Sequence, residues 1–71
     1  MISSSARLVA FGLLDAAIST GEQRLGALVD AVCCVLAHDG RDGEETARLA
    51  LEAVVHPTVA REAVRVLVEE I

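Results

Sequence analysis

Apolar residues recur at three- and four-residue spacing along most of this 71-residue chain. That spacing places one side of an α-helix in a core, whereas a half-buried strand requires alternating apolar and polar residues. No alternation of any length occurs, and turn-forming residues interrupt the helical spacing at three places. The sequence therefore predicts a single all-α domain over residues 1–71, a small bundle of three to four short helices.

The first expected helix covers about residues 5–19, after three serines that offer N-cap oxygens. It carries apolar residues on two flanks, and a helix that is apolar on nearly all sides must be enclosed. We therefore expect this helix to contact more than the chain's own core. One flank consists of Leu8, Phe11, Leu14 and Ile18, and the other of Val9, Leu13, Ala16 and Ala17.

A second helix is expected to begin at Thr20, because Thr20 and Gln23 have the spacing of a capping box. It should end near His38, whose ring complements the negative end of the helix dipole. Its apolar residues form one stripe, as in an amphipathic helix with a single buried face. The stripe consists of Leu25, Leu28, Val29, Val32, Val35 and Leu36.

Two glycines and two aspartates between 39 and 43 predict a turn. A third helix is expected over about residues 43–55, stopped by the pair His56 and Pro57. Pro57 is suited to open a fourth helix, where its missing N–H costs nothing. The expected inner residues are Ala47, Ala50, Leu51, Val54 and Val55 in the third helix and Ala60, Val64, Leu67, Val68 and Ile71 in the fourth.

A chain of this size rarely stabilises itself with its core alone, and disulfides, a metal or a second subunit usually contribute. Cys33 and Cys34 are adjacent, which suits neither a disulfide framework nor a zinc ribbon, so we expect two small buried side chains. The surplus apolar surface instead predicts a bundle completed by homodimerisation. The expected self-association residues are Leu8, Phe11, Leu14, Ile18, Leu25, Val29 and Val32.

The composition argues against nucleic acid and membranes as partners. The net charge is −5 and Phe11 is the single aromatic residue, so phosphate attraction and base stacking are both weak. No apolar run approaches the length of a membrane span, and no leader pattern precedes the first helix. We expect a cytoplasmic protein. Its basic residues are all arginine, a coding bias that points to bacterial or phage origin.

Residues on both sides of the expected turn form a pattern: Ala37, Asp39, Gly40, Glu44 and Glu45. This pattern resembles the helix, Asp-Gly turn and Glu-Glu helix start of tellurite-resistance TerB-like domains. Clustered carboxylates on such a turn would suit a hard cation. An EF-hand loop is absent, because its third and twelfth positions are Arg41 and Ala50. We therefore predict a capped turn without a metal.

Cys34 and His38 lie four residues apart, a spacing that can supply two zinc ligands. A zinc site needs about four ligands, so a two-fold dimer would have to contribute the same pair twice. Cys34, His38 and Asp39 also name the parts of a nucleophilic triad. All three fall at one helix end, and the chain leaves no length for a substrate pocket. We predict neither an enzyme nor a cofactor.

The segment 56–61 resembles the start of the recognition helix in bacterial helix-turn-helix regulators. The resemblance covers residues 45–71 and implies that Arg61 and Arg65 face a DNA groove. Two features depart from that pattern. The usual turn glycine is Ala53, and normally buried positions of the preceding helix fall on Arg48 and Glu52. A DNA-binding regulator that uses residues 45–71 is therefore the alternative hypothesis.

The principal hypothesis is a small acidic protein–protein interaction module, a homodimeric regulator, inhibitor or adaptor. Such a module acts by presenting a helical surface with a charged rim to a partner protein. The sequence does not identify that protein, although the acidic rim favours a basic one. The residues expected to form the partner surface are Glu44, Glu45, Arg48 and Glu52.

Overall fold

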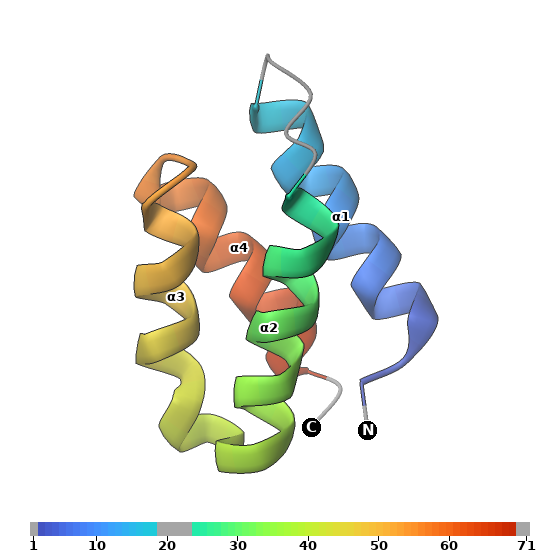
Figure 1. The fold of residues 1–71 in the computed structure, drawn as a ribbon, viewed down its shortest axis with the longest axis vertical. Coiled ribbons are helices and arrows are strands. Elements are labelled where there is room, and N and C mark those ends of the chain that lie inside the picture. The colour runs from blue at the N-terminus through green and yellow to red at the C-terminus, as the bar shows by residue number, and fades with distance from the viewer. Residues whose placement is uncertain (1, 19–23, 70–71) are drawn as a thin grey trace.

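The computed structural model describes residues 2–18 and 24–69, and it confirms the all-α prediction. Four α-helices and one 3-10 turn make up these ranges, with no strand among them (Figure 1). The expected start of the second helix at Thr20, its capping partner Gln23 and the expected inner residue Ile71 lie outside the described residues. The elements are α1 (Ser4–Ala17), α2 (Leu25–Asp39), η1 (Gly40–Gly43), α3 (Glu44–Glu52) and α4 (Pro57–Val68).

Local caps explain where α1 and α4 begin. The amide of Ala6 donates to Oγ of Ser3 at 3.2 Å, which satisfies one of the free amides of α1. At the start of α4, Nδ1 of His56 accepts from the amide of Thr58 at 3.2 Å, with Pro57 as the first helical residue. The predicted start of the fourth helix at Pro57 is thus confirmed.

The third helix is shorter than predicted, because α3 ends at Glu52 instead of near residue 55. The amides of Val54 and Val55 both donate to the carbonyl of Leu51, at 3.0 Å each, and this closes a turn. The following His56 is extended, with ψ of 143°, as expected for a residue before proline. The chain therefore leaves the helix one turn early, and Val54 becomes exposed.

The helices enclose a core made of alanine, valine, leucine and isoleucine side chains together with Cys33. Helices α1 and α3 each pack against both α2 and α4, and the two lie at opposite sides of the bundle (Figure 1). No polar or charged residue is buried within the described ranges. The largest fully buried side chains are Leu14, Leu25, Leu36, Leu51 and Leu67.

Helix α1 buries Leu14 of the first expected flank together with two alanines that belong to neither flank. Ala6, Ala10 and Leu14 face the core at four-residue spacing, which forms a ridge that fits the grooves of a neighbouring helix. Leu8 remains 71% exposed, Val9 52% and Phe11 36%. Leu8, Val9 and Phe11 thus lie outside a core that accommodates Ala6, Ala10 and Leu14.

Three further inner assignments are corrected. Ala50 and Val54 of the third segment are exposed, because the buried side of α3 runs through Ala47 and Leu51. Cys34 is exposed while Cys33 is buried, since adjacent residues of a helix point about 100° apart. The remaining described residues of the second and fourth stripes are buried or half-buried, as predicted.

The link between α2 and α3 depends on two glycines of η1. Gly40 has φ of +62°, a conformation that side-chain-bearing residues rarely adopt. Gly43 is buried, and a Cβ atom there would lie 2.8 Å from Cγ1 of Val35 and 3.0 Å from its carbonyl oxygen. This close approach fixes the start of α3 against α2.

We predict that Leu36→Ala lowers the free energy of unfolding by about 2–5 kcal/mol, because it leaves a cavity at a fully buried site. Chemical denaturation followed by circular dichroism measures the change. Leu49→Ala is the matched control, since Leu49 is 55% exposed, and its effect should stay within about 0.5 kcal/mol. Equal losses in the two variants would contradict the described core.

Candidate interaction surfaces

A hollow of about 390 Å³ lies between α3 and α4. Its two walls carry charged side chains of both signs, and Val64, which is only 3% exposed, contributes an apolar base. Three of the four residues predicted for the partner surface lie here, whereas Glu52 does not line the hollow. The lining residues are Glu44, Glu45 and Arg48 from α3 and Arg61, Val64 and Arg65 from α4.

The charged side chains of α3 pair along their own helix. Arg48 donates to the carboxylate of Glu52 four residues later and lies 3.9 Å from a carboxylate oxygen of Glu45. The Arg48 and Glu52 side chains are only 32% and 22% exposed. Because each is paired with the other, both are tolerated where a helix-turn-helix pattern would place apolar residues.

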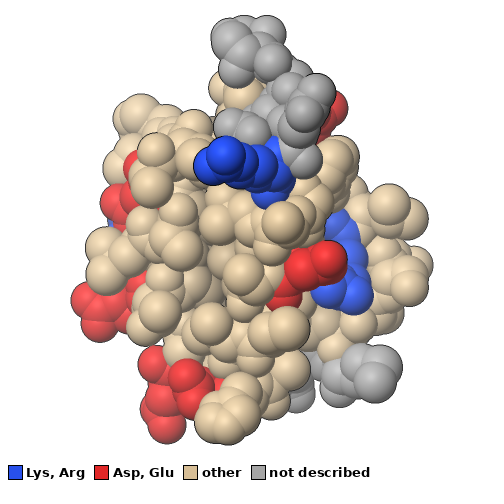
Figure 2. Space-filling view, in the orientation of Figure 1, with Lys and Arg blue, Asp and Glu red and all other residues tan. Residues whose placement is uncertain are grey.

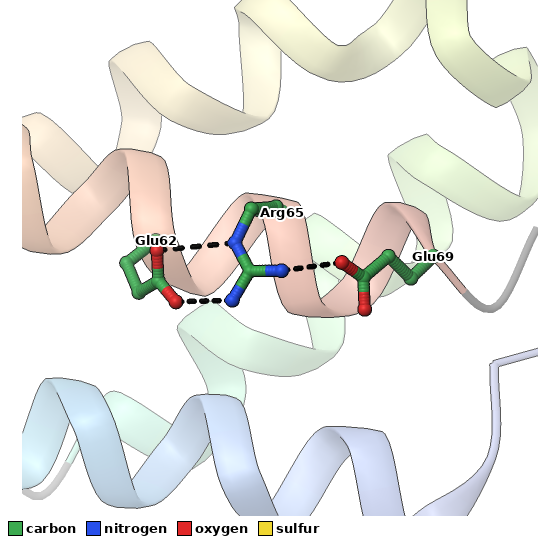
Figure 3. A network of polar contacts seen from close by, with 3 residues as sticks. All are labelled: Glu62, Arg65 and Glu69. Carbon is green, nitrogen blue, oxygen red and sulfur yellow. Dashed lines mark hydrogen bonds and ion pairs between the residues drawn. The ribbon is translucent and has the colours of Figure 1, made fainter.

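A second charged network lies on α4 and is confined to that helix (Figure 3). Arg65 donates to both carboxylate oxygens of Glu62, in one case from Nε at 3.1 Å, and donates to Glu69 on its other side. The hydrogen bond to Glu62 raises the pKa of the Arg65 guanidinium above its ordinary value. The same hydrogen bond lowers the pKa of the Glu62 carboxyl. Arg65 is therefore largely neutralised by its neighbours.

Arg61 differs from the other arginines that line the hollow. Its exposed guanidinium has no hydrogen bond or ion pair within the described part of the chain. The sequence explains this, because positions three and four residues away hold Pro57, Thr58, Val64 and Arg65 and offer no carboxylate. In the sequence, Arg61 belongs to the DNA-binding alternative alone. The lack of a carboxylate three or four residues from Arg61 is the sequence feature that could have indicated its place in this surface.

The residues predicted for self-association divide into two groups. Leu8 and Phe11 lie on the outside of α1, beside Val9. Arg7 of α1 and Asp30 of α2 form an ion pair between these two helices. Charged side chains of both signs are visible over α2 and the adjoining part of α1, and acidic side chains gather over α3 and the turn before it (Figure 2). The second group cannot form an outer surface in this fold: Leu14, Leu25, Val29 and Val32 are core residues, and Ile18 packs partly against them.

The candidate metal and catalytic residues do not converge. His38 and Asp39 are in contact, with Nδ1 of the ring 2.8 Å from a carboxylate oxygen, and both side chains are at least half exposed. The candidate thiol, Cys34, is exposed, whereas the neighbouring Cys33 is buried, and burial raises the pKa of the Cys33 thiol. Across residues 2–18 and 24–69, no group of three or more potential metal ligands occurs. Nor does any helix in these ranges have the length and apolarity needed to cross a membrane.

Comparison of the chain with protein-family models, with curated proteins and with solved structures finds no match in any of the three. The two surfaces described above are therefore the basis for assigning a function. One is the outer side of α1, with its exposed apolar side chains. The other is the charged hollow between α3 and α4.

We predict that Arg65→Gln raises the pKa of the Glu62 carboxyl toward its usual value, because the hydrogen bond that stabilises the carboxylate is lost. An NMR titration of the side-chain carboxyl carbons measures this shift. The Glu62 and Arg65 pair stabilises the fold above the unfolded pKa of Glu62 and stops doing so as the pH falls through the lowered value.

Arg61→Gln is the control for that titration, since Arg61 has no partner among residues 2–18 and 24–69 that it would release. It removes the same charge from the same helix and should leave the pKa of the Glu62 carboxyl unchanged. A Glu62 pKa that stays low in Arg65→Gln would show that another group holds the carboxylate.

Proposed function

We propose that this chain is a small, acidic, cytoplasmic protein–protein interaction module that forms a homodimer and binds a further protein as a regulator, inhibitor or adaptor. It acts by binding and not by catalysis. The observation that carries the proposal is the exposed apolar group on the outside of α1, headed by Leu8 at 71% exposure. Contiguous apolar side chains that a core leaves outside are typical of interaction sites.

The self-association half of the proposal rests on the geometry of α1. Leu8 and Phe11 lie three residues apart, and neighbours at that spacing share one side of a helix. Burial of such a pair against a second subunit would add apolar contacts to a core that consists of small and aliphatic side chains. This narrows the expected interface from seven residues to the outer part of α1.

The partner-binding half rests on the hollow between α3 and α4. Val64 offers an apolar base, and charged groups surround it, as in the polar rim of a protein interface. Arg61, which has no partner among the described residues, would donate to a carboxylate of the bound protein, whereas the first-turn residues Glu44 and Glu45 would receive a basic side chain. We propose a protein segment of mixed charge as the ligand of this hollow.

The pairing of the arginines supports a protein ligand over duplex DNA, the alternative hypothesis. A recognition helix needs unoccupied cationic groups, because phosphate neutralisation dominates DNA binding. Arg65 is held between Glu62 and Glu69, so carboxylates already occupy one of the two arginines of α4. Arg61 alone would be available to phosphate within the described part of α4.

We predict that the wild-type chain sediments as a dimer at high concentration and that Leu8→Glu is monomeric under the same conditions. The physical reason is that a charge at the centre of an apolar contact must be desolvated without a partner. Leu49→Glu is the control, since Leu49 is 55% exposed and belongs to α3, which lies across the bundle from α1 (Figure 1). A wild-type monomer at every concentration would refute this half of the proposal.

We predict that Arg61→Glu removes the proteins that the wild-type chain retains from a lysate of its host, while Leu49→Glu does not. Affinity capture followed by quantitative mass spectrometry makes the comparison. Duplex DNA at low salt is the parallel assay, and the module should not retain it. Salt-sensitive retention of DNA that Arg61→Ala abolishes would favour the helix-turn-helix alternative instead.

A further inference from the structure

We infer that two copies of the chain pair through α1 in antiparallel orientation, with Leu8 of each copy against Phe11 of the other. This inference rests on the self-association half of the proposed function and specifies the partner and the register of that contact. Its basis is a line of exposed residues along α1, which we call the α1 seam: Ser4, Leu8, Phe11 and Asp15.

The residues of the α1 seam are separated by four, three and four positions, which is the spacing that keeps a narrow stripe on one side of a helix. Such a seam matches a second copy of itself when the two helices run in opposite directions. A two-fold axis between positions 9 and 10 places Leu8 over the partner's Phe11 and Ser4 over the partner's Asp15. Both contacts then occur twice, as a symmetric dimer interface requires.

The polar ends of the α1 seam are also complementary in charge. The Asp15 carboxylate is exposed and has no hydrogen bond or ion pair within the described residues. The first turn of α1 carries no acidic residue, although the free amides at a helix N-terminus favour a negative group. Antiparallel pairing brings Asp15 of each copy to that turn of the other. Parallel pairing would instead place the two Asp15 carboxylates against each other.

Small residues beside the α1 seam leave room for the two helices to approach. Gly12 lies next to Leu8 on the exposed side, and a Cβ atom there would meet nothing within 4 Å. The chain's own packing therefore does not require a glycine at this position, and a glycine inside a helix lowers its stability. Ser5 lies on the same flank, about two helical turns before Gly12. A second helix lying over this flank gives the small residues a structural role.

Chemical cross-linking tests the register, with a short bismaleimide and chains that carry one introduced thiol each. The background is Cys34→Ser, in which the remaining native thiol of Cys33 is buried. We expect a cross-linked dimer from a mixture of Ser4→Cys and Asp15→Cys chains and none from either variant alone. In antiparallel pairing, two identical thiols at position 4 or at position 15 are separated by about 16 Å along the helix axis.

The outcomes separate the register from self-association itself. Cross-linking of each variant with itself would show parallel helices, and a dimer that no variant cross-links would show a contact elsewhere. Either result would overturn the inferred register and leave the proposed homodimer in place. A chain that stays monomeric from roughly micromolar to millimolar concentration would overturn the register and the homodimer together, while binding at the α3–α4 hollow has its own test.

A pair of glycine variants tests the close approach of the helices. Gly12→Leu should raise the dimer dissociation constant at least about tenfold, because the new side chain occupies the space of the second helix. Gly26→Leu is the matched control, since Gly26 is also an exposed helical glycine with nothing within 4 Å of a built Cβ. It should leave the dissociation constant unchanged. An unchanged constant in Gly12→Leu would contradict the inferred contact, provided circular dichroism shows that both variants fold.

Discussion

The burial of the alanine side of α1 is the constraint on which the rest of the structure depends. Ala6 and Ala10 are almost inaccessible, and α1 makes its most extensive contact with α4, whose Ala60 and Ala63 are also fully buried. Small side chains let helix backbones approach closely and leave few voids. The same choice turns Leu8 and Phe11 outward. A tight core and an exposed apolar side are thus two results of a single packing arrangement.

This arrangement explains which parts of the fold the sequence predicts. Helices α2 and α4 each carry one apolar stripe beside a polar side, so the pattern identifies their buried faces and the structure agrees. In α1 apolar residues surround the helix, and the pattern cannot tell which of them face the core. A prediction that assigns the largest apolar side chains to the core selects Leu8 and Phe11. The close packing of helices instead buries Ala6 and Ala10. That choice depends on the shape of α4, which the local sequence does not specify.

The charged surface follows a simpler rule, because most of its pairs lie within one helix. Arg48 with Glu52 and Arg65 with Glu69 have the spacing of helical ion pairs, and a reader of the sequence can identify both. The hollow itself could not be predicted, since it joins α3 to α4 across the bundle. Arg61 is informative for the opposite reason: helical spacing gives it no carboxylate. In the proposed function, this lack of a helical partner makes the Arg61 guanidinium the group that binds a carboxylate of the partner protein.

The cap at the start of α4 ties that position to the chemistry of one imidazole ring. Nδ1 of His56 accepts a hydrogen bond from the amide of Thr58, so the neutral ring must carry its proton on Nε2. Because Pro57 has no N–H, the amide of Thr58 is the first free amide of α4, and this ring satisfies it. The first turn of α4 leads directly to Arg61. The ring of one exposed histidine thereby helps to set where the Arg61 guanidinium of the hollow is held.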